Sequence, residues 1–146
     1  MNPYLVFAPM LVLVILIFIV WMQMFRVRVR EIKRKRIHPQ KLTDSRATAA
    51  QFEDIATADN FRNLFELPVL FYALCLAIFT TGQLSPALLL LCWLFVITRC
   101  LHSWIHCSYN NVMHRFRAYV VGGFALFGAW LLFAILLLRQ GWLIAA

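Results

Sequence analysis

Long, mostly apolar stretches alternate with polar connections along this chain. The apolar runs cover about residues 3–25, 62–81, 86–107 and 118–138. A helix needs about 20 apolar residues to cross the hydrocarbon core of a bilayer. A segment inside the bilayer must satisfy its own backbone hydrogen bonds, and the alternation of barrel strands is absent, so all four runs should be helical. The pattern therefore predicts an all-α membrane protein built as a bundle of four transmembrane helices.

The polar connections differ in length. Between the second and third runs lies only TGQLSP, and Pro86 suits a first helical turn, so these two runs should form an antiparallel hairpin. The connection over residues 26–61 is long and basic. The first helix is expected to continue past the membrane and stop before Pro39. Asp44 and Ser45 are candidate caps for a short helix over residues 46–60 that leads into the second run.

Composition agrees with a membrane protein. The chain has 146 residues, a length suited to a single domain over residues 1–146, and it is 63% hydrophobic and 14% charged. The first run is not expected to be a cleaved signal peptide, because it lacks a basic n-region and a stop-transfer pattern, FRVRVREIKRKR, follows it. The four cysteines all fall within the runs, so neither a disulfide nor a catalytic thiol is expected. Small residues on the fourth run predict a close helix contact at Ala118, Gly122, Ala125 and Ala129.

Basic residues are concentrated in two of the connections. Ten lie within residues 26–62, Arg115 and Arg117 open the fourth run, and only Arg139 lies near the opposite side. The positive-inside rule places the basic connections in the cytoplasm and both termini outside, in the inner or plasma membrane of the cell. The net charge of +8 should attract anionic membrane lipids. No nucleic-acid partner is expected, because no nucleic-acid-binding motif accompanies the charge.

Polar and ionisable residues gather near the predicted cytoplasmic ends of three runs. Those on the third run, from Arg99 to Tyr109, are spaced by three, four and three residues, which is the pattern of one helix face. Ionisable groups near hydrocarbon are costly, and they mark candidate functional sites by default. The residues are Arg62, Asn63, Glu66, Arg99, His102, His106, Tyr109, Arg115 and Tyr119.

These side chains suit an anionic, peptide-like ligand. Arginine binds carboxylates in bidentate fashion, Asn63 and the histidines can bond amides, and Glu66 can receive an ammonium group. An arginine or tyrosine beside a thiol favours the thiolate, which is the reactive nucleophile. A tripeptide thiol with two carboxylates and one amine fits these requirements. The apolar helix faces nearby would then accept a lipophilic second substrate.

The segment FRNLFELP, with Arg62, Asn63, Glu66 and Pro68, resembles the second-helix signature of the MAPEG superfamily of eicosanoid and glutathione metabolism. RCLHSWIHCSYNNVMHRFRAY is similar to the third and fourth helices of that family. The resemblance implies a homotrimer that binds glutathione between subunits and acts as a transferase or peroxidase on a lipophilic electrophile. It makes Arg115 the catalytic residue nearest the thiol. The candidate glutathione-binding residues are Arg28, Arg62, Asn63, Glu66, His102, His106 and Tyr119.

Three positions depart from the family pattern, and two other hypotheses stay open. Well-studied members carry tyrosine at the position of His106, often serine at Phe116 and often arginine at Asp59. In one alternative, the polar cluster only holds together a non-enzymatic trimeric membrane protein. In the other, His102 and His106 chelate a metal from one helical turn, although the glutamate of a His-Glu-x-x-His site is missing.

Overall fold

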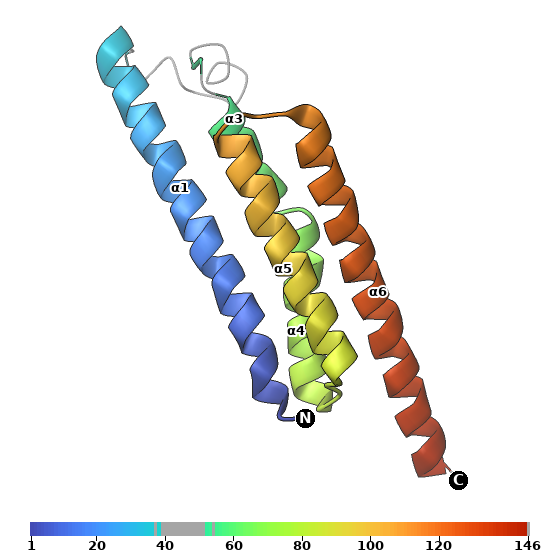
Figure 1. The fold of residues 1–146 in the computed structure, drawn as a ribbon. Helices are drawn as coiled ribbons and strands as arrows, with labels where there is room; N and C mark the ends of the chain where they lie inside the picture. The colour runs from blue at the N-terminus through green and yellow to red at the C-terminus, as the bar shows by residue number, and fades with distance from the viewer. Residues whose placement is uncertain (37, 39–51, 54, 146) are drawn as a thin grey trace.

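The computed structural model describes residues 1–36, 38, 52–53 and 55–145, and these are almost entirely helical. Figure 1 shows the long helices side by side, with both chain termini at one end of the molecule. We call the opposite end, where α1 ends and α6 begins, the loop end. The elements are η1 Pro3–Val6, α1 Phe7–Lys35, α3 Ala56–Asn63, α4 Leu67–Thr81, α5 Pro86–Cys107 and α6 Val112–Ala145.

Among the residues that the structure describes, four helical segments are long and apolar enough to cross a membrane. They are Pro3–Lys35, Ala56–Thr81, Pro86–Cys107 and Val112–Gly141. The chain is thus an integral, multi-pass membrane protein, as its apolar runs predict. The first helix does continue beyond its apolar part and stops before Pro39. The candidate caps of the short helix, Asp44 and Ser45, lie outside the described residues.

The second run is not one helix beginning at Arg62, and this corrects the expectation from the sequence. α3 begins earlier, at Ala56, and ends at Asn63, and α4 starts at Leu67 after a turn. Pro68 explains the interruption, because its missing N–H and its ring rule out a regular helical bond to the carbonyl of Leu64. In the first turn of α4 the same proline is tolerated.

The fourth helix also begins earlier than the apolar pattern indicated. α6 starts at Val112, six residues before the expected position 118. Asn111 explains this start, because its Oδ1 accepts hydrogen bonds from the backbone N–H of Met113 at 3.0 Å and of His114 at 3.2 Å. An asparagine that caps the first helical N–H groups stabilises a helix N-terminus. The polar first two turns of α6 therefore stay helical, and they include Arg115.

α5 is the central helix of the chain. It contacts both α1 and α6, and Figure 1 shows it between them. Half of its most apolar stretch is buried, against 22–33% for the other three candidate spans. Its turn with α4 contains Gly82 at φ +69°, a left-handed conformation that glycine adopts without steric cost. α4 and α5 run in opposite directions in Figure 1, and the ring centroids of Phe71 and Phe95 lie 4.9 Å apart between them, so the predicted hairpin of the second and third runs is present.

α6 packs closely against α5 at Gly122. A Cβ added to this glycine would lie 2.6 Å from Thr98 Oγ1 and 3.1 Å from Arg99 Nη2. The other small residues of this predicted contact, Ala118, Ala125 and Ala129, are buried as well. The packing of α6 therefore sets the distance between the polar ends of the two helices.

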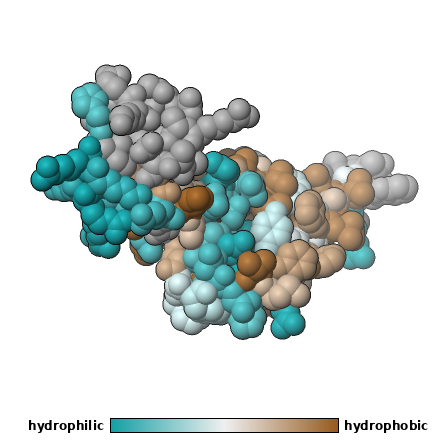
Figure 2. Space-filling view, turned by 90° about the horizontal axis from the view of Figure 1, so that it is seen from above, coloured by the Kyte–Doolittle hydropathy of each residue, from teal (hydrophilic) through white to brown (hydrophobic). Residues whose placement is uncertain are grey.

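The loop end carries a hydrophilic surface. Figure 2 looks onto this end, and hydrophilic residues gather on the left, the side on which α1 ends in Figure 1. There Glu53 Oε2 lies 2.6 Å from Arg34 Nη2, and Glu53 Oε1 lies 3.1 Å from Lys35 Nζ. The backbone N–H of Glu53 donates to Glu31 Oε2 at 2.9 Å. These contacts hold Glu53 against the end of α1.

Candidate functional site

The polar stripe of α5 is buried along most of its length. Arg99, His102 and His106 are only 1%, 4% and 3% exposed, so one helix face carries three buried polar side chains. Tyr109 does not continue this stripe, contrary to the spacing argument. α5 ends at Cys107, the chain turns through Asn110 at φ +46°, and Tyr109 is exposed. The helical spacing fails there because the helix has already ended.

Arg99 links α5 to α6. Its Nη2 donates a hydrogen bond to the backbone carbonyl of Tyr119 at 3.1 Å. Its guanidinium carbon lies 4.7 Å from the ring centroid of Tyr119 and 5.4 Å from that of Phe95. A guanidinium stacked on aromatic faces is stabilised electrostatically. Arg99 therefore fixes the position of Tyr119 relative to α5.

One ring nitrogen of His102 lacks a hydrogen-bond partner among the described residues. Its Nδ1 lies 3.1 Å from the backbone carbonyl of Arg115, and because a carbonyl only accepts, Nδ1 must carry the proton. In the neutral imidazole Nε2 is then an acceptor. This Nε2 is buried and has no hydrogen-bond partner among the described residues. A buried acceptor without a partner is costly, so a bound donor would stabilise it.

His106 and Asn110 position the side chain of Arg115. Arg115 Nη1 lies 2.9 Å from His106 Nε2 and 2.9 Å from Asn110 Oδ1. Since arginine has no acceptor, His106 Nε2 accepts, and its proton lies on Nδ1. A guanidinium carries five N–H donors, so these two contacts leave donors for a ligand. The arrangement holds a permanent cation at the start of α6.

Four of the predicted site residues line one cavity, of about 210 Å³. It lies between α3, α5 and the first turns of α6. Its polar lining combines an amide, an imidazole, a guanidinium and a phenol. The complete lining is Asn63, His102, Val112, Arg115, Phe116 and Tyr119. We call this space the polar cavity.

A second cavity, of about 240 Å³, shares Tyr119 with the polar cavity. Its other lining residues are all apolar, and they come from the start of α4 and from α6. They are Leu67, Val120, Gly123, Phe124 and Phe127. We call it the apolar cavity. One tyrosine thus stands between a polar space and an apolar one.

Four predicted site residues line neither cavity. One is His106, which contacts Arg115 instead. The other three are Arg62, Glu66 and Arg28. The side chain of Arg62 is 73% exposed, and its Nη1 lies 3.9 Å from Asp59 Oδ1. Glu66 is exposed at the start of α4. The guanidinium of Arg28 stacks 5.9 Å from the ring centroid of Phe52. Among the described residues, no hydrogen bond or ion pair joins these three to His102 or Arg115.

Asn60 is a buried polar residue that the sequence reasoning missed. Its side chain is 0% exposed. Its Oδ1 accepts a hydrogen bond from Ser103 Oγ at 3.2 Å, and its Nδ2 donates to Cys107 Sγ at 3.3 Å. Asn60 precedes Asn63 by three residues, a helical spacing that places both on neighbouring positions of α3. The three-residue spacing from Asn63 was the sequence signal that could have identified Asn60. Its two hydrogen bonds join α3 to α5 beside the polar cavity.

The metal hypothesis finds little support in this geometry. No group of three or more histidine, cysteine or acidic residues that could hold a metal occurs among the residues that the structure describes. His106 Nε2 faces the guanidinium of Arg115, and His102 Nδ1 faces a carbonyl. A second cation beside Arg115 would be repelled.

Comparison with known proteins gives one match. The family described as MAPEG matches residues 6–135, which include every residue that lines the two cavities. No curated protein and no solved structure matches the chain.

Proposed function

The chain belongs to the MAPEG family, and from this premise we propose that it binds glutathione in the polar cavity and activates the thiolate toward a lipophilic electrophile. The observation that carries the proposal is that His102 lines this cavity while its buried Nε2 has no hydrogen-bond partner among the described residues. An amide N–H of a peptide would satisfy it. The same cavity offers the amide of Asn63 and the cation of Arg115 to a tripeptide.

Arg115 is the catalytic residue of this proposal. His106 and Asn110 each hold its Nη1, so the guanidinium is oriented before a ligand arrives. A fixed cation beside a thiol stabilises the thiolate and lowers the pH at which it forms. Tyr119, held by Arg99 through its backbone and ring, places its hydroxyl-bearing side chain at the border of both cavities.

The apolar cavity suits the second substrate. Its lining is apolar apart from Tyr119, and it adjoins the space proposed for the thiol. The bound tripeptide supplies the sulfur nucleophile. Water takes up the thiol proton, a carbon–sulfur bond forms, and the leaving group departs from the electrophile with its electron pair. Membrane helices surround both partners, which favours lipophilic substrates that partition into the bilayer.

A homotrimer would complete the site. The polar cavity, at about 210 Å³, lies below the roughly 300–1,000 Å³ of ordinary ligand pockets. Arg62 and Glu66 are exposed at the loop end, where a neighbouring subunit could bring them to the remaining carboxylates and amine of the ligand. We assign the same role to Arg28. Large apolar residues are exposed along all four spans, which leaves surface for both lipid and subunit contacts.

The basic residues at the loop end support a cytoplasmic location for the polar cavity. Both termini then lie outside the cytoplasm, and Figure 1 shows them together at the other end. Reporter fusions at Ala146 test this orientation. A fusion that reports a cytoplasmic C-terminus would place the cavity on the other side of the membrane.

Titration of the detergent-purified protein with glutathione, followed by calorimetry, tests the proposed function. We expect saturable binding that His102→Phe weakens about tenfold, because a buried acceptor is lost. Tyr4→Phe, at the opposite end of the subunit, should bind as the parent does. If the parent does not bind glutathione and His102→Phe dissociates the oligomer in native mass spectrometry, the polar cluster is structural only.

A further inference from the structure

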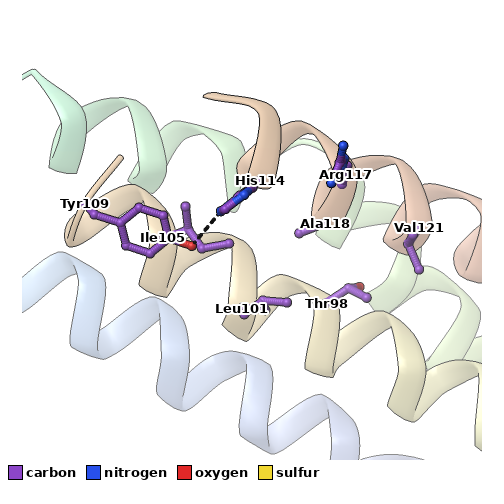
Figure 3. Close-up of a pocket in the computed structure, with 8 residues that line it drawn as sticks. All are labelled: Thr98, Leu101, Ile105, Tyr109, His114, Arg117, Ala118 and Val121. Carbon is purple, nitrogen blue, oxygen red and sulfur yellow. Dashed lines mark hydrogen bonds between the residues drawn. The ribbon is translucent and has the colours of Figure 1, made fainter. Parts of the chain in front are cut away.

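A third hollow lies between α5 and α6, and neither cavity of the proposed function includes it. It is a groove of about 360 Å³, within the size range of ligand-binding pockets. Figure 3 shows side chains of the two helices on either side of it, with Tyr109 and His114 at one end. The lining residues are Thr98, Leu101, Ile105, Tyr109, His114, Arg117, Ala118 and Val121. We call it the α5–α6 groove.

The groove lies on the opposite face of α6 from the polar cavity. An α-helix turns about 100° per residue, so Val121, two residues after Tyr119, points to the other side of the helix. The same offset separates Arg117 from Arg115. The groove is thus a separate surface, and inferences about it do not rest on the proposed glutathione site.

The groove is amphipathic. Its middle is formed by Leu101, Ile105 and Val121, and two of these are well exposed, Leu101 at 45% and Val121 at 47%. Its loop end carries the exposed side chains of His114 and Arg117. Tyr109 Oη lies 3.1 Å from His114 Nδ1, which closes the groove at that end. An apolar trough therefore leads to a rim that carries the positive charge of Arg117; we call it the cationic rim.

The cationic rim has no acidic partner on its own helices. The last acidic residue of the sequence is Glu66, so α5 and α6 contain no carboxylate side chain. Arg117 forms no ion pair with a described residue. A ligand with an anionic head and a hydrocarbon tail would complement a groove that is apolar along its length and positively charged at its end.

We propose that the α5–α6 groove binds an anionic phospholipid, with an acyl chain along Leu101 and Val121 and the headgroup phosphate at Arg117 and His114. The bilayer supplies this ligand in the right orientation. The groove lies towards the loop end, the same end of the molecule at which α1 finishes in basic residues, and basic pockets between transmembrane helices bind anionic headgroups. Tyr109 is amphipathic, as are the aromatic residues enriched at membrane interfaces.

Native mass spectrometry of the full chain in detergent tests the headgroup contact. The protein is titrated with phosphatidylglycerol and with phosphatidylcholine of the same acyl chains. The parent should bind phosphatidylglycerol more tightly, and Arg117→Gln should weaken this binding about fivefold, which corresponds to one cation near the surface. Arg30→Gln is the matched control, because it removes an exposed cation from the same end of the molecule without touching the groove.

Filling the groove tests the acyl-chain contact. Val121→Trp should lower the affinity for phosphatidylglycerol severalfold, and Leu101→Trp is a second filling variant from the other helix. Leu90→Trp is the control, because Leu90 is 69% exposed on α5 and does not line the groove. Binding that survives both filling variants would overturn the proposal.

Two further results would also overturn it. If Arg30→Gln and Arg117→Gln weaken the binding of phosphatidylglycerol equally, the lipid is attracted by the overall positive charge of the loop end and not bound in the groove. If Val121→Cys resists a maleimide in lipid-free detergent while the exposed control Leu90→Cys reacts, a second copy of the chain covers the groove. Reaction of Val121→Cys that phosphatidylglycerol then blocks, and phosphatidylcholine does not, would support the proposal.

Discussion

Arg99, His102 and His106 on α5 are buried and bonded to α6, whereas Arg62 and Glu66, which flank the break between α3 and α4, are exposed. Both groups lie within the residues that match the MAPEG family. The α5–α6 group is assembled inside one subunit by helix packing at Gly122. The α3–α4 group has no such cover among the described residues. The difference indicates that one half of the proposed site is prebuilt and that the other half depends on an additional surface.

The largest effect is expected at the prebuilt half. Arg115→Ala should lower turnover with a chlorodinitrobenzene about 100-fold, because it removes a fixed cation from the developing thiolate. Arg115→Lys should retain part of the activity. Arg139→Ala, near the far end of α6, serves as the charge-matched control. Steady-state kinetics in detergent checks this, and unchanged turnover in Arg115→Ala would remove this residue from the chemistry.

The next largest effect is expected on stability, when Gly122 is replaced at the contact between α5 and α6. Gly122→Ala places a methyl group against Thr98 and Arg99, and overpacking of this kind lowers stability by about 1–3 kcal/mol. Gly128→Ala meets no atom within 4 Å and should leave stability equal or raise it slightly. Thermal unfolding in mild detergent measures both. Equal melting temperatures for the two variants would contradict this prediction, because they would show that the helices accommodate the added methyl group at Gly122 without a loss of stability.

The exposed half should affect binding without affecting folding. Glu66→Gln should raise the dissociation constant for glutathione about tenfold, because a charge-assisted hydrogen bond to the ligand amine is lost. The melting temperature should hardly change, as for most exposed positions. Glu53→Gln removes an equal charge away from the cavities and serves as the control. A trimer that falls apart in Glu66→Gln would instead identify the carboxylate as an intersubunit contact.

The smallest effect concerns the segment before α3. Hydrogen bonds from Arg34 and then from Lys35 lower the pKa of Glu53 below its ordinary value of 4.5. Because the pKa of Glu53 is lower in the folded state, its ionised carboxylate stabilises the contact above about pH 4.5. This stabilisation is lost as the pH falls through the lower pKa of the folded state. Amide hydrogen exchange at Glu53, corrected for its intrinsic pH dependence, should show protection decreasing in that range. Arg34→Gln should lose protection at a higher pH than the parent.

Local sequence was sufficient for the membrane spans. Whether a segment crosses the bilayer depends on the transfer of its own side chains and on backbone bonds within it. The bounds of α5 therefore agree with the apolar run over residues 86–107. The spacing of Arg99, His102 and His106 likewise predicted one face, because that face needs only an unbroken helix. The sequence also contains local signals for the break at Pro68 and for the cap at Asn111, although the apolar pattern alone does not include them.

Only the tertiary structure decided which polar residues meet. Asn63, His102 and Arg115 lie on three different helices, and their shared cavity depends on how closely α6 approaches α5 and on where α3 stops. That Nε2 of His102 is the acceptor nitrogen follows from the carbonyl of Arg115, thirteen residues away in the chain. No spacing rule contains that information, because side chains distant in sequence meet only through the angles and distances at which whole helices pack. The roles of the site residues therefore stay predictions, while the membrane-spanning helices that carry them follow from the apolar pattern itself.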